Sequence, residues 1–348
     1  MLVLTNGDVR HVLDGRDLEI VDAVRDAYVR HAEGHTMLPN SVFLRFPDQP
    51  SDRIIALPAY LGGKPEIAGV KWISSFPGNV DAGLERASAA IILNTLSTGR
   101  PVALIEGSVI SARRTAASAA LASAVLAAPA APERVTLVGC GVINFEVLRF
   151  LRAVHPTVTD VVTHDLSPAR ATAFAARIAA ELPDLRVRDE PDQAEALGAS
   201  ELVSLATTAA TPYLATEAMR PGTLVLHLSL RDLLPAAILA AVNVVDDPDH
   251  VCRADTSLDL AQRQCGDRSF ISATIGELLR AGGHTPRDPD RVTVYSPFGL
   301  GVLDLAVAEL VRSGAELSGL GTRIDDFLPG AADRCDDAPR SSVPATQR

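Results

Sequence analysis

The sequence is poor in the residues that hold metals and form disulfides. Four cysteines occur in 348 residues, and they stand at no metal-ligand spacing. The eight histidines form no HxxxH or HExxH pattern, so we predict that the protein has no metal site. Cys140 lies inside a glycine turn, where a disulfide would obstruct a ligand, and we expect reduced thiols in a cytoplasm.

The sequence also lacks the segments that direct a chain to a membrane or to nucleic acid. No basic region followed by an apolar one opens the chain, and the longest apolar runs contain charges or helix breakers. We therefore expect no signal peptide and no transmembrane span. The net charge is −11 without a Lys/Arg-rich block, which argues against nucleic-acid and membrane partners. An anionic ligand would need a local basic pocket.

The composition is that of a globular protein with two domains. Hydrophobic residues make up 47% of the chain and charged residues 22%, and the length suffices for two hydrophobic cores. The first part predicts a mixed, mainly antiparallel sheet with helices on one side. Its expected strands cover residues 2–4, 41–46, 53–58, 67–74, 87–96 and 102–106, and its expected helices cover residues 17–33 and 108–128.

Residues 135–165 predict a nucleotide-binding βαβ unit. A short apolar run at 135–138 is followed at once by Gly139, Cys140 and Gly141, and then by apolar residues at helical spacing. Gly139 permits a sharp turn, Gly141 lets backbone N–H groups approach a pyrophosphate, and the helix N-terminus favours the anion. Asn144 replaces the third glycine of the usual fingerprint. An ordinary glycine-rich loop of an α/β protein is the alternative interpretation.

The acidic residue after the second strand of this unit predicts which dinucleotide binds. Asp165 stands 26 positions after Gly139, where its carboxylate would accept hydrogen bonds from a ribose 2′-OH and repel a 2′-phosphate. This favours NAD over NADP.

Strands and helices continue to alternate after Asp165, which predicts a doubly wound parallel sheet of the Rossmann type. Expected strands lie at 185–188, 202–206, 224–228, 243–246 and 292–295, and expected helices at 168–182, 192–197, 235–240, 251–265, 274–281 and 303–312. The last helix is expected to return to the first domain, which makes that domain discontinuous. The resulting domains are 1–118 with 302–328, and 119–301, followed by a disordered tail at 329–348.

Four polar groups lie beside apolar strands or at strand ends, and each has two interpretations. Lys71 is either an edge residue with an apolar stem or a catalytic or carboxylate-binding amine. Arg113 and Arg114 open an Ala-rich helix, where the helix dipole disfavours cations, so they either bind an anion or are solvated. Arg45 is a surface charge or a substrate ligand. Asp232 caps the next helical turn or lies at the ligand-binding edge of the sheet.

The sequence resembles the ornithine cyclodeaminase/μ-crystallin family over about residues 1–325. The resemblance rests on Gly69 to Trp72, on Arg114 and Thr115 with the small residues after them, on the Gly139 turn and on Asp232. Residues 71–77, 85–88, 141–145, 229–232 and 296–301 are similar to its SbnB-like branch, which acts in making 2,3-diaminopropionate for siderophores and peptide antibiotics. Residues 228–231 are bulkier than the Gly-rich loop of the cyclodeaminases, and Arg231 adds a cation there, which favours a substrate with more carboxylates than ornithine.

The resemblance implies a homodimer and an oxidoreductase that uses NAD. The implied reaction is oxidative cleavage of N-(1-amino-1-carboxy-2-ethyl)-L-glutamate, by hydride transfer and imine hydrolysis, to 2,3-diaminopropionate and 2-oxoglutarate. Lys71 and Asp232 are then the catalytic candidates, and the substrate-binding candidates are Arg45, Lys71, Ser75, Arg86 and Arg114. The cofactor-binding candidates are Thr115, Gly139, Gly141, Val142, Ile143, Asn144, Asp165, Thr207, Ser229 and Gly299.

The sequence is also compatible with two other classes of function. The protein could be another enzyme of the family, such as an ornithine or lysine cyclodeaminase, an alanine dehydrogenase or a ketimine reductase. It could also be a μ-crystallin-like protein that binds NAD(H) without catalysis.

Overall fold

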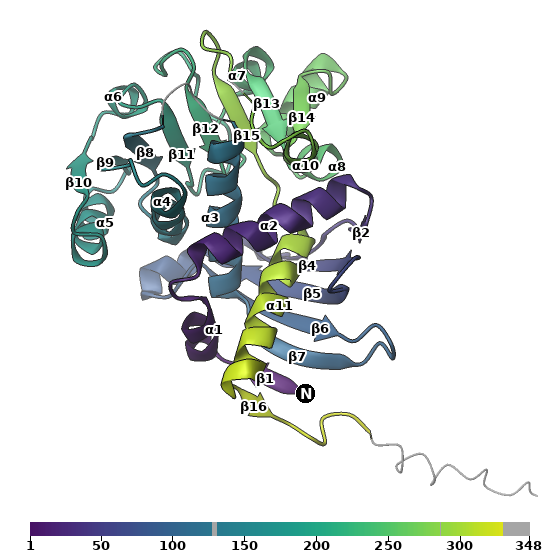
Figure 1. Ribbon diagram of the computed structural model, residues 1–348. Helices are drawn as coiled ribbons and strands as arrows, with labels where there is room; N and C mark the ends of the chain where they lie inside the picture. The colour runs from purple at the N-terminus through teal and green to yellow at the C-terminus, as the bar shows by residue number, and fades with distance from the viewer. Residues whose placement is uncertain (127–130, 286, 330–348) are drawn as a thin grey trace, which may run out of the picture.

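The computed structural model describes residues 1–126, 131–285 and 287–329, which form two lobes (Figure 1). Each lobe is built on an eight-stranded sheet, one mixed and one parallel. This is the α/β architecture that the sequence predicted, so the predicted fold class is confirmed. Among the described residues, no helix is both long and apolar enough to cross a membrane.

The first sheet is mixed and mainly antiparallel. Its strands are β1 (Leu2–Leu4), β2 (Thr36–Met37), β3 (Val42–Phe46), β4 (Gln49–Leu61), β5 (Ile67–Ser75), β6 (Ala87–Asn94), β7 (Pro101–Glu106) and β16 (Thr322–Arg323). They lie in the order β16-β1-β7-β6-β5-β4-β2, and β3 also pairs with β4. Among the described strands of this sheet, β1 and β7 are the only parallel pair.

Helices cover one face of the first sheet. They are α1 (Asn6–Leu13), α2 (Asp17–Ala32), the first part of α3 (Ser108–Val125) and α11 (Gly301–Ser318). A short 3₁₀ helix, η1 (Pro77–Ala82), lies between β5 and β6 in the chain. α11 packs on β4, β5 and β6 although it follows the second lobe in sequence. Successive side chains of β5 point to opposite faces of the sheet. Lys71, on the helix-covered face, is therefore 2% exposed, whereas its neighbour Trp72, on the other face, is 47% exposed.

The second sheet is entirely parallel, with the strand order β10-β9-β8-β11-β12-β15-β13-β14. Its strands are β8 (Arg134–Val138), β9 (Asp160–His164), β10 (Arg186–Asp189), β11 (Leu202–Leu205), β12 (Leu224–His227), β13 (Val242–Val245), β14 (Ile271–Thr274) and β15 (Thr293–Ser296). The helices of this lobe are α4 (Val142–Val154), α5 (Pro168–Glu181), α6 (Gln193–Leu197), α7 (Pro235–Ala240), α8 (Pro248–Val251), α9 (Ser257–Cys265) and α10 (Ile275–Arg280). The central strands are buried on both faces, as parallel sheets require.

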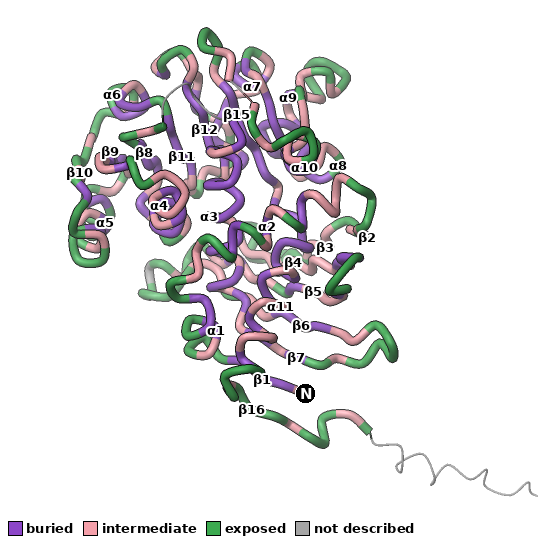
Figure 2. Tube along the Cα trace, in the orientation of Figure 1, coloured by how far each residue is buried: buried purple, intermediate pink, exposed green. Residues whose placement is uncertain are grey.

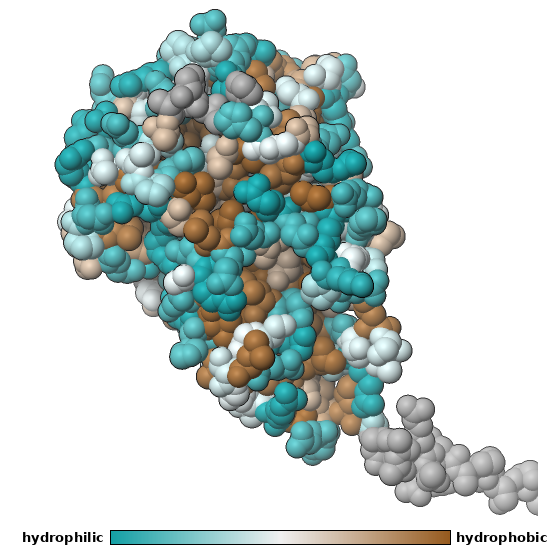
Figure 3. Space-filling view, in the orientation of Figure 1, coloured by the Kyte–Doolittle hydropathy of each residue, from teal (hydrophilic) through white to brown (hydrophobic). Residues whose placement is uncertain are grey.

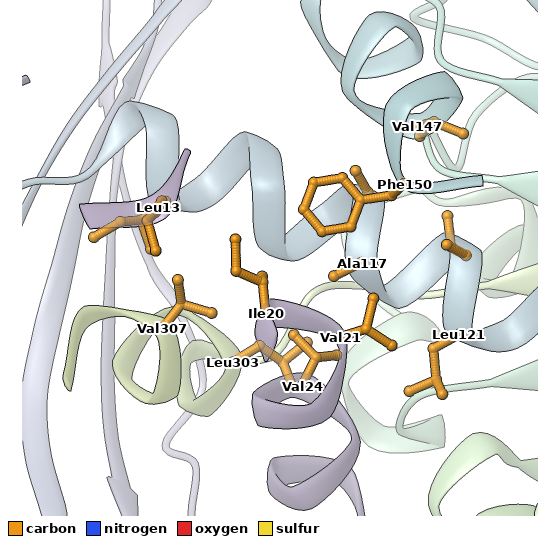
Figure 4. Packing of buried hydrophobic residues seen from close by; sticks show 14 of the residues in the cluster. Leu13, Ile20, Val21, Val24, Ala117, Leu121, Val147, Phe150, Leu303 and Val307 are labelled. Atoms are coloured by element: carbon orange, nitrogen blue, oxygen red, sulfur yellow. The ribbon is translucent and has the colours of Figure 1, made fainter. Parts of the chain in front are cut away.

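One hydrophobic core joins the two lobes. Val21 and Val24 of α2 pack with Phe150 of α4, and Leu303 of α11 lies beside them (Figure 4). Figure 2 shows that the chain is buried where α2, α3 and α11 meet the second lobe. Removing this apolar area from water stabilises the arrangement of the lobes, and it holds α3 and α11 where they carry polar side chains into the junction.

Several predicted boundaries differ from the structure. Residues 251–265 were predicted as one helix, but α8 and α9 are separated by Ala254 and Asp255, both at positive φ. β14 was missed: residues 271–273 had no predicted element, and Thr274 was predicted as the first residue of the following helix. The predicted boundary between residues 118 and 119 lies inside α3. Three predicted features lie outside the described residues: the change of composition near Pro129, nearly all of the predicted tail, and Cys335.

Candidate active site

Lys71 lies in a central strand of the first sheet and is buried. Its strand β5 is paired on both sides, with Leu57 of β4 and Ile91 of β6 opposite Lys71. Its ammonium donates hydrogen bonds to Oδ2 of Asp304 at 2.7 Å and to the Ser111 hydroxyl at 3.2 Å. The interpretation of Lys71 as an edge residue in water is therefore wrong.

Asp304 binds Arg114 as well as Lys71. Its other oxygen, Oδ1, accepts a hydrogen bond from Nε of Arg114 at 3.1 Å, and the carboxylate is fully buried. Sequence reasoning missed Asp304, although a carboxylate within the apolar run of the last helix is a signal that a partner cation lies nearby. With Lys71 protonated, two cations share one carboxylate, and the cluster Lys71–Asp304–Arg114 carries one net positive charge. With Lys71 neutral, the net charge is zero, and the Arg114 guanidinium is the remaining cation.

The terminal nitrogens of Arg114 have no hydrogen-bond partner among the described residues. A Cβ at Gly299 would lie 2.5 Å from Nη1 of Arg114, and Gly299 has φ +92°. The positive φ favours glycine here, and a side chain at this position would displace the Arg114 guanidinium. Asp246 anchors this loop by accepting hydrogen bonds from the N–H groups of Phe298 and Gly299. The structure thus brings the predicted residues Lys71, Arg114 and Gly299 together at the lobe junction.

The environment of Lys71 changes its acidity. Burial lowers its pKa to about 8, although the Asp304 carboxylate opposes the shift, and the positive charge of Arg114 lowers the pKa further. Lys71 can therefore exchange a proton near neutral pH, which an ordinary lysine does not.

Arg113 points away from this cluster. It is 1% exposed and forms ion pairs with Asp14 of the first lobe and Glu146 of α4. The alternative of a solvated Arg113–Arg114 pair is wrong, because both guanidiniums are buried with carboxylates. Arg113 connects the lobes, and Arg114 serves the candidate site.

Asp232 lies at the carboxyl edge of the parallel sheet, within a set of polar side chains. Its carboxylate accepts hydrogen bonds from the hydroxyls of Thr207 and Ser229, and it lies 3.4 Å from Nε2 of the buried His227. Asp232 caps no helix, since the residue before α7 is Leu234. Burial by itself raises the pKa of Asp232. The hydrogen bond and charge of His227, together with the two hydroxyls, have the larger combined effect and lower the pKa, so the carboxyl group is ionised.

The glycine turn has the conformation that a dinucleotide-binding loop requires. Gly139 has φ +94°, and a Cβ there would lie 2.5 Å from the Ala206 carbonyl oxygen. Gly141 precedes α4, and the N–H groups of the first turn, at Val142 and Ile143, have no intrahelical acceptor. Asn144 is fully buried and donates to the Val138 and Gly139 carbonyls while it accepts from Ser204. Asn144 therefore ties the helix to the two adjoining strands.

Asp165 follows β9 beside the glycine turn. Its carboxylate accepts hydrogen bonds from the N–H groups of Cys140 and Ser167, at 2.8 and 2.9 Å. Arg170 lies 3.5 Å from the same carboxylate. These bonds hold Asp165 at the end of its strand, where the sequence placed it.

The remaining predicted residues are distributed over both lobes. Ser75 is buried at the end of β5, Arg86 is half-buried just before β6, and Arg45 is exposed on β3. Thr115 lies within α3, where its hydroxyl donates to the Ser111 carbonyl. A cavity of about 740 Å³ lies away from all these groups, between the β6–β7 hairpin and residues 323–328.

The fold and these groups define a two-lobed α/β protein with a dinucleotide-type glycine turn and a buried cation cluster at the lobe junction. The chain belongs to the ornithine cyclodeaminase/mu-crystallin family, whose model matches residues 2–318. The family resemblance predicted from the sequence is confirmed.

Individual relatives extend the similarity over nearly the whole chain. The N-((2S)-2-amino-2-carboxyethyl)-L-glutamate dehydrogenase of Staphylococcus aureus (strain NCTC 8325 / PS 47) is 27% identical over 331 residues, which cover 93% of this chain and 98% of that protein. The structure of CmnK superposes with a TM-score of 0.86 at 29% identity, covering 94% and 99%. An archaeal alanine dehydrogenase dimer with bound NAD has a TM-score of 0.83 at 26% identity, also covering 94% and 99%.

Proposed function

We propose that this protein is an NAD-dependent oxidoreductase that acts on the C–N bond of N-(1-amino-1-carboxy-2-ethyl)-L-glutamate. Hydride leaves the glutamate α-carbon, and water hydrolyses the resulting imine to 2,3-diaminopropionate and 2-oxoglutarate. The observation that carries the proposal is the net positive cluster Lys71–Asp304–Arg114, which can hold one substrate carboxylate. The similar Staphylococcus enzyme, whose name specifies this substrate, supports the same reaction.

The residues of the second lobe fit a dinucleotide. Gly141 has no side chain to block a pyrophosphate, and the first N–H groups of α4 are free to bind it. Asp165 would accept hydrogen bonds from the adenosine ribose, and Thr207, Ser229 and Gly299 would hold the nicotinamide end. The bound NAD supplies the hydride acceptor.

The residues of the chain itself would orient the substrate and move protons. Arg114 would bind a carboxylate through its terminal nitrogens, and Lys71 would bind it or accept the amine proton. Asp232 stays ionised, so it would orient the attacking water and stabilise the cationic iminium. Fixing the carboxylates aligns the α-carbon for hydride transfer, which supplies much of the rate.

A coupled assay tests the reaction. The purified protein with NAD and the glutamate adduct should accumulate NADH and release 2-oxoglutarate in equal amounts. With ornithine, product release has to be measured, because a cyclodeaminase regenerates NAD in each turnover and would also give no lasting absorbance change. Ornithine-dependent release of proline and ammonia would contradict the proposal, and NADH formation from alanine alone would identify an alanine dehydrogenase. Binding of NADH without turnover of any of these amines would favour the non-enzymatic role.

The two glycines of the turn should respond differently to alanine. Gly141→Ala places a methyl group where nothing but Nη2 of Arg170 lies within 4 Å, at 3.6 Å, so the protein should fold normally but bind NADH more weakly. Gly139→Ala meets a carbonyl oxygen at positive φ and should lower the melting temperature. Thermal unfolding and NADH fluorescence titration measure the two effects. Normal NADH affinity in Gly141→Ala would contradict the assigned pyrophosphate site.

The outer face of the first sheet supports a homodimer. Val42, Leu44 and Trp72 are 64%, 46% and 47% exposed, and Val42 and Trp72 lie in one row across β3, β4 and β5. This face lies behind α11 in the orientation of Figures 1 and 3, where hydrophobic patches among hydrophilic residues are seen on the helix-covered side of the first lobe. Burying such a face in a second copy would remove it from water. Light scattering should give twice the 36.6 kDa mass of the chain.

The biological setting follows the same proposal. The product diamine would serve siderophore or peptide antibiotic biosynthesis, and the reaction would take place in the cytoplasm. Cys140, Cys252 and Cys265 are free thiols in the structure, which such a reducing compartment would preserve.

A further inference from the structure

Four arginines that belong to different strands and loops are close enough for their charges to act on one another. Arg45, Arg53 and Arg86 come from the first lobe, and Arg231 comes from the loop before Asp232 in the second. Sequence reasoning did not single out Arg53. We call these four residues the arginine cluster.

The sheet register places Arg45, Arg53 and Ser75 side by side on one face of the first sheet. Arg45 of β3 lies opposite Arg53 of β4, and Arg53 lies opposite Ser75 of β5. Ser75 is four residues from Lys71, so both side chains point to the same face of the sheet. At about 3.3 Å per residue, Ser75 is roughly 13 Å along the strand from Lys71. The row of Arg45, Arg53 and Ser75 and the Lys71 cluster therefore lie on the same face of the sheet, separated along the strand direction.

Among the described side chains, the only carboxylates that act on the arginine cluster do so at Arg231, where Asp255 and Asp232 oppose the lowering of its pKa. No carboxylate among the described side chains lies within ion-pair distance of Arg45, Arg53, Arg86 or Arg231. Arg231 donates to the Ala254 carbonyl, but Nε of Arg53 is buried without a hydrogen-bond partner in the part of the chain that the structure describes. The Ser75 hydroxyl is also buried and unpartnered, in a side chain that is 8% exposed. Buried polar groups without partners are costly, so this set is suited to an anionic ligand.

The charges also affect one another. Burial, and then the positive charges of Arg231, Arg86 and Arg45, lower the pKa of Arg53. The pKa of Arg231 is lowered by burial and by Arg45, although Asp255 opposes the shift. Like charges held this close repel, and a bound anion would relieve the repulsion.

We propose that Arg53 and Arg231, with Arg45, Arg86 and Ser75, form a second carboxylate-binding centre, which selects substrates that carry a further carboxylate at a distance from the reacting amine. This rests on the proposed function, in which the glutamate side chain supplies that carboxylate. Because Arg231 comes from the second lobe and the other residues from the first, the centre holds the far arm of the substrate from both sides. Arg53 and Arg231 are specificity-determining residues in this assignment.

Two ligands that differ in a single group test the centre. 2-Oxoglutarate and 2-oxopentanoate have the same chain length, but a methyl group replaces the distal carboxylate in the second. Calorimetric titration of the protein saturated with NADH should show that 2-oxoglutarate binds about 10- to 100-fold more tightly. In Arg53→Gln and Arg231→Gln this ratio should fall towards one, while the affinity for 2-oxopentanoate stays the same. Arg10→Gln, which removes an exposed guanidinium of α1, is the control and should keep the full ratio.

A stability measurement separates this assignment from a purely structural role. Arg53→Gln removes one of several repelling charges, so its melting temperature without ligand should equal or exceed that of the parent protein. A structural arginine would instead lower the melting temperature and leave the ligand ratio unchanged, and that result would overturn the inference.

Failure of the inference and failure of the proposed function give different results. If the glutamate adduct is oxidised and Arg53→Gln leaves its KM unchanged, the reaction stands and the second centre is wrong. If the adduct is not oxidised but the 2-oxoglutarate preference depends on Arg53, the centre stands and the assigned reaction is wrong.

Discussion

Asp304→Asn is expected to lower the free energy of unfolding by about 3–5 kcal/mol, the usual result of removing one member of a buried ion pair. Asp304 is the shared partner of Lys71 and Arg114, and it is fully buried. An asparagine cannot balance either charge, so two cations would remain in a desolvated position. Chemical denaturation at pH 7 measures the difference.

The control for this substitution changes the same functional group in water. Asp22 lies on α2 with a side chain that is 76% exposed, 3.8 Å from Arg25. Asp22→Asn should change stability by less than about 0.5 kcal/mol, as surface substitutions usually do. Adding Lys71→Met to Asp304→Asn should restore part of the loss, because one unbalanced cation is removed. Equal stability of Asp304→Asn and the parent protein would show that the cluster is not held as described.

Lys71→Ala is expected to lower kcat by about 10²- to 10⁴-fold, the usual contribution of a positioned acid or base. The affinity for NADH should not change, because Lys71 lies on the first sheet and the glycine turn on the second. Lys64→Ala, which removes an exposed lysine from the same lobe, should keep full activity. Steady-state rates and NADH fluorescence titrations measure the two quantities.

If Lys71 transfers a proton, an added amine should be able to replace it in the alanine variant. Ethylamine in the medium should restore part of its activity, with a rate that depends on the pKa of the added amine. A variant in which only KM rises, without rescue by any amine, would show that Lys71 anchors a carboxylate and that Asp232 handles the proton.

The pH dependence of the reaction follows from the lowered pKa of Lys71. The amine must be neutral to accept a proton, and its neutral fraction increases as the pH rises through about 8. The rate of amine oxidation should therefore increase with pH and reach half its maximum near pH 8. Asp232 cannot produce this step, because its pKa is lowered and it is ionised well below that pH. A rate independent of pH between 7 and 9 would exclude Lys71 as the base.

The sequence by itself determined the parts of this protein that depend on local interactions. The strand, glycine turn, helix and acidic residue of the second lobe lie within about thirty positions of one another, and each has its own conformational signature. The sharp turn at Gly139 and the place of Asp165 could therefore be predicted, as could the alternation of strands and helices that produces the parallel sheet.

Only the tertiary structure decided which charges meet. Lys71 and Asp304 are 233 positions apart, and they pair because α11 returns to pack on β5 after a complete second lobe. Arg53 joins Arg45 and Ser75 through the register of three strands, which a residue pattern does not specify. Local sequence determines the preferred conformation of a segment, whereas the partner of a buried charge depends on how distant segments pack.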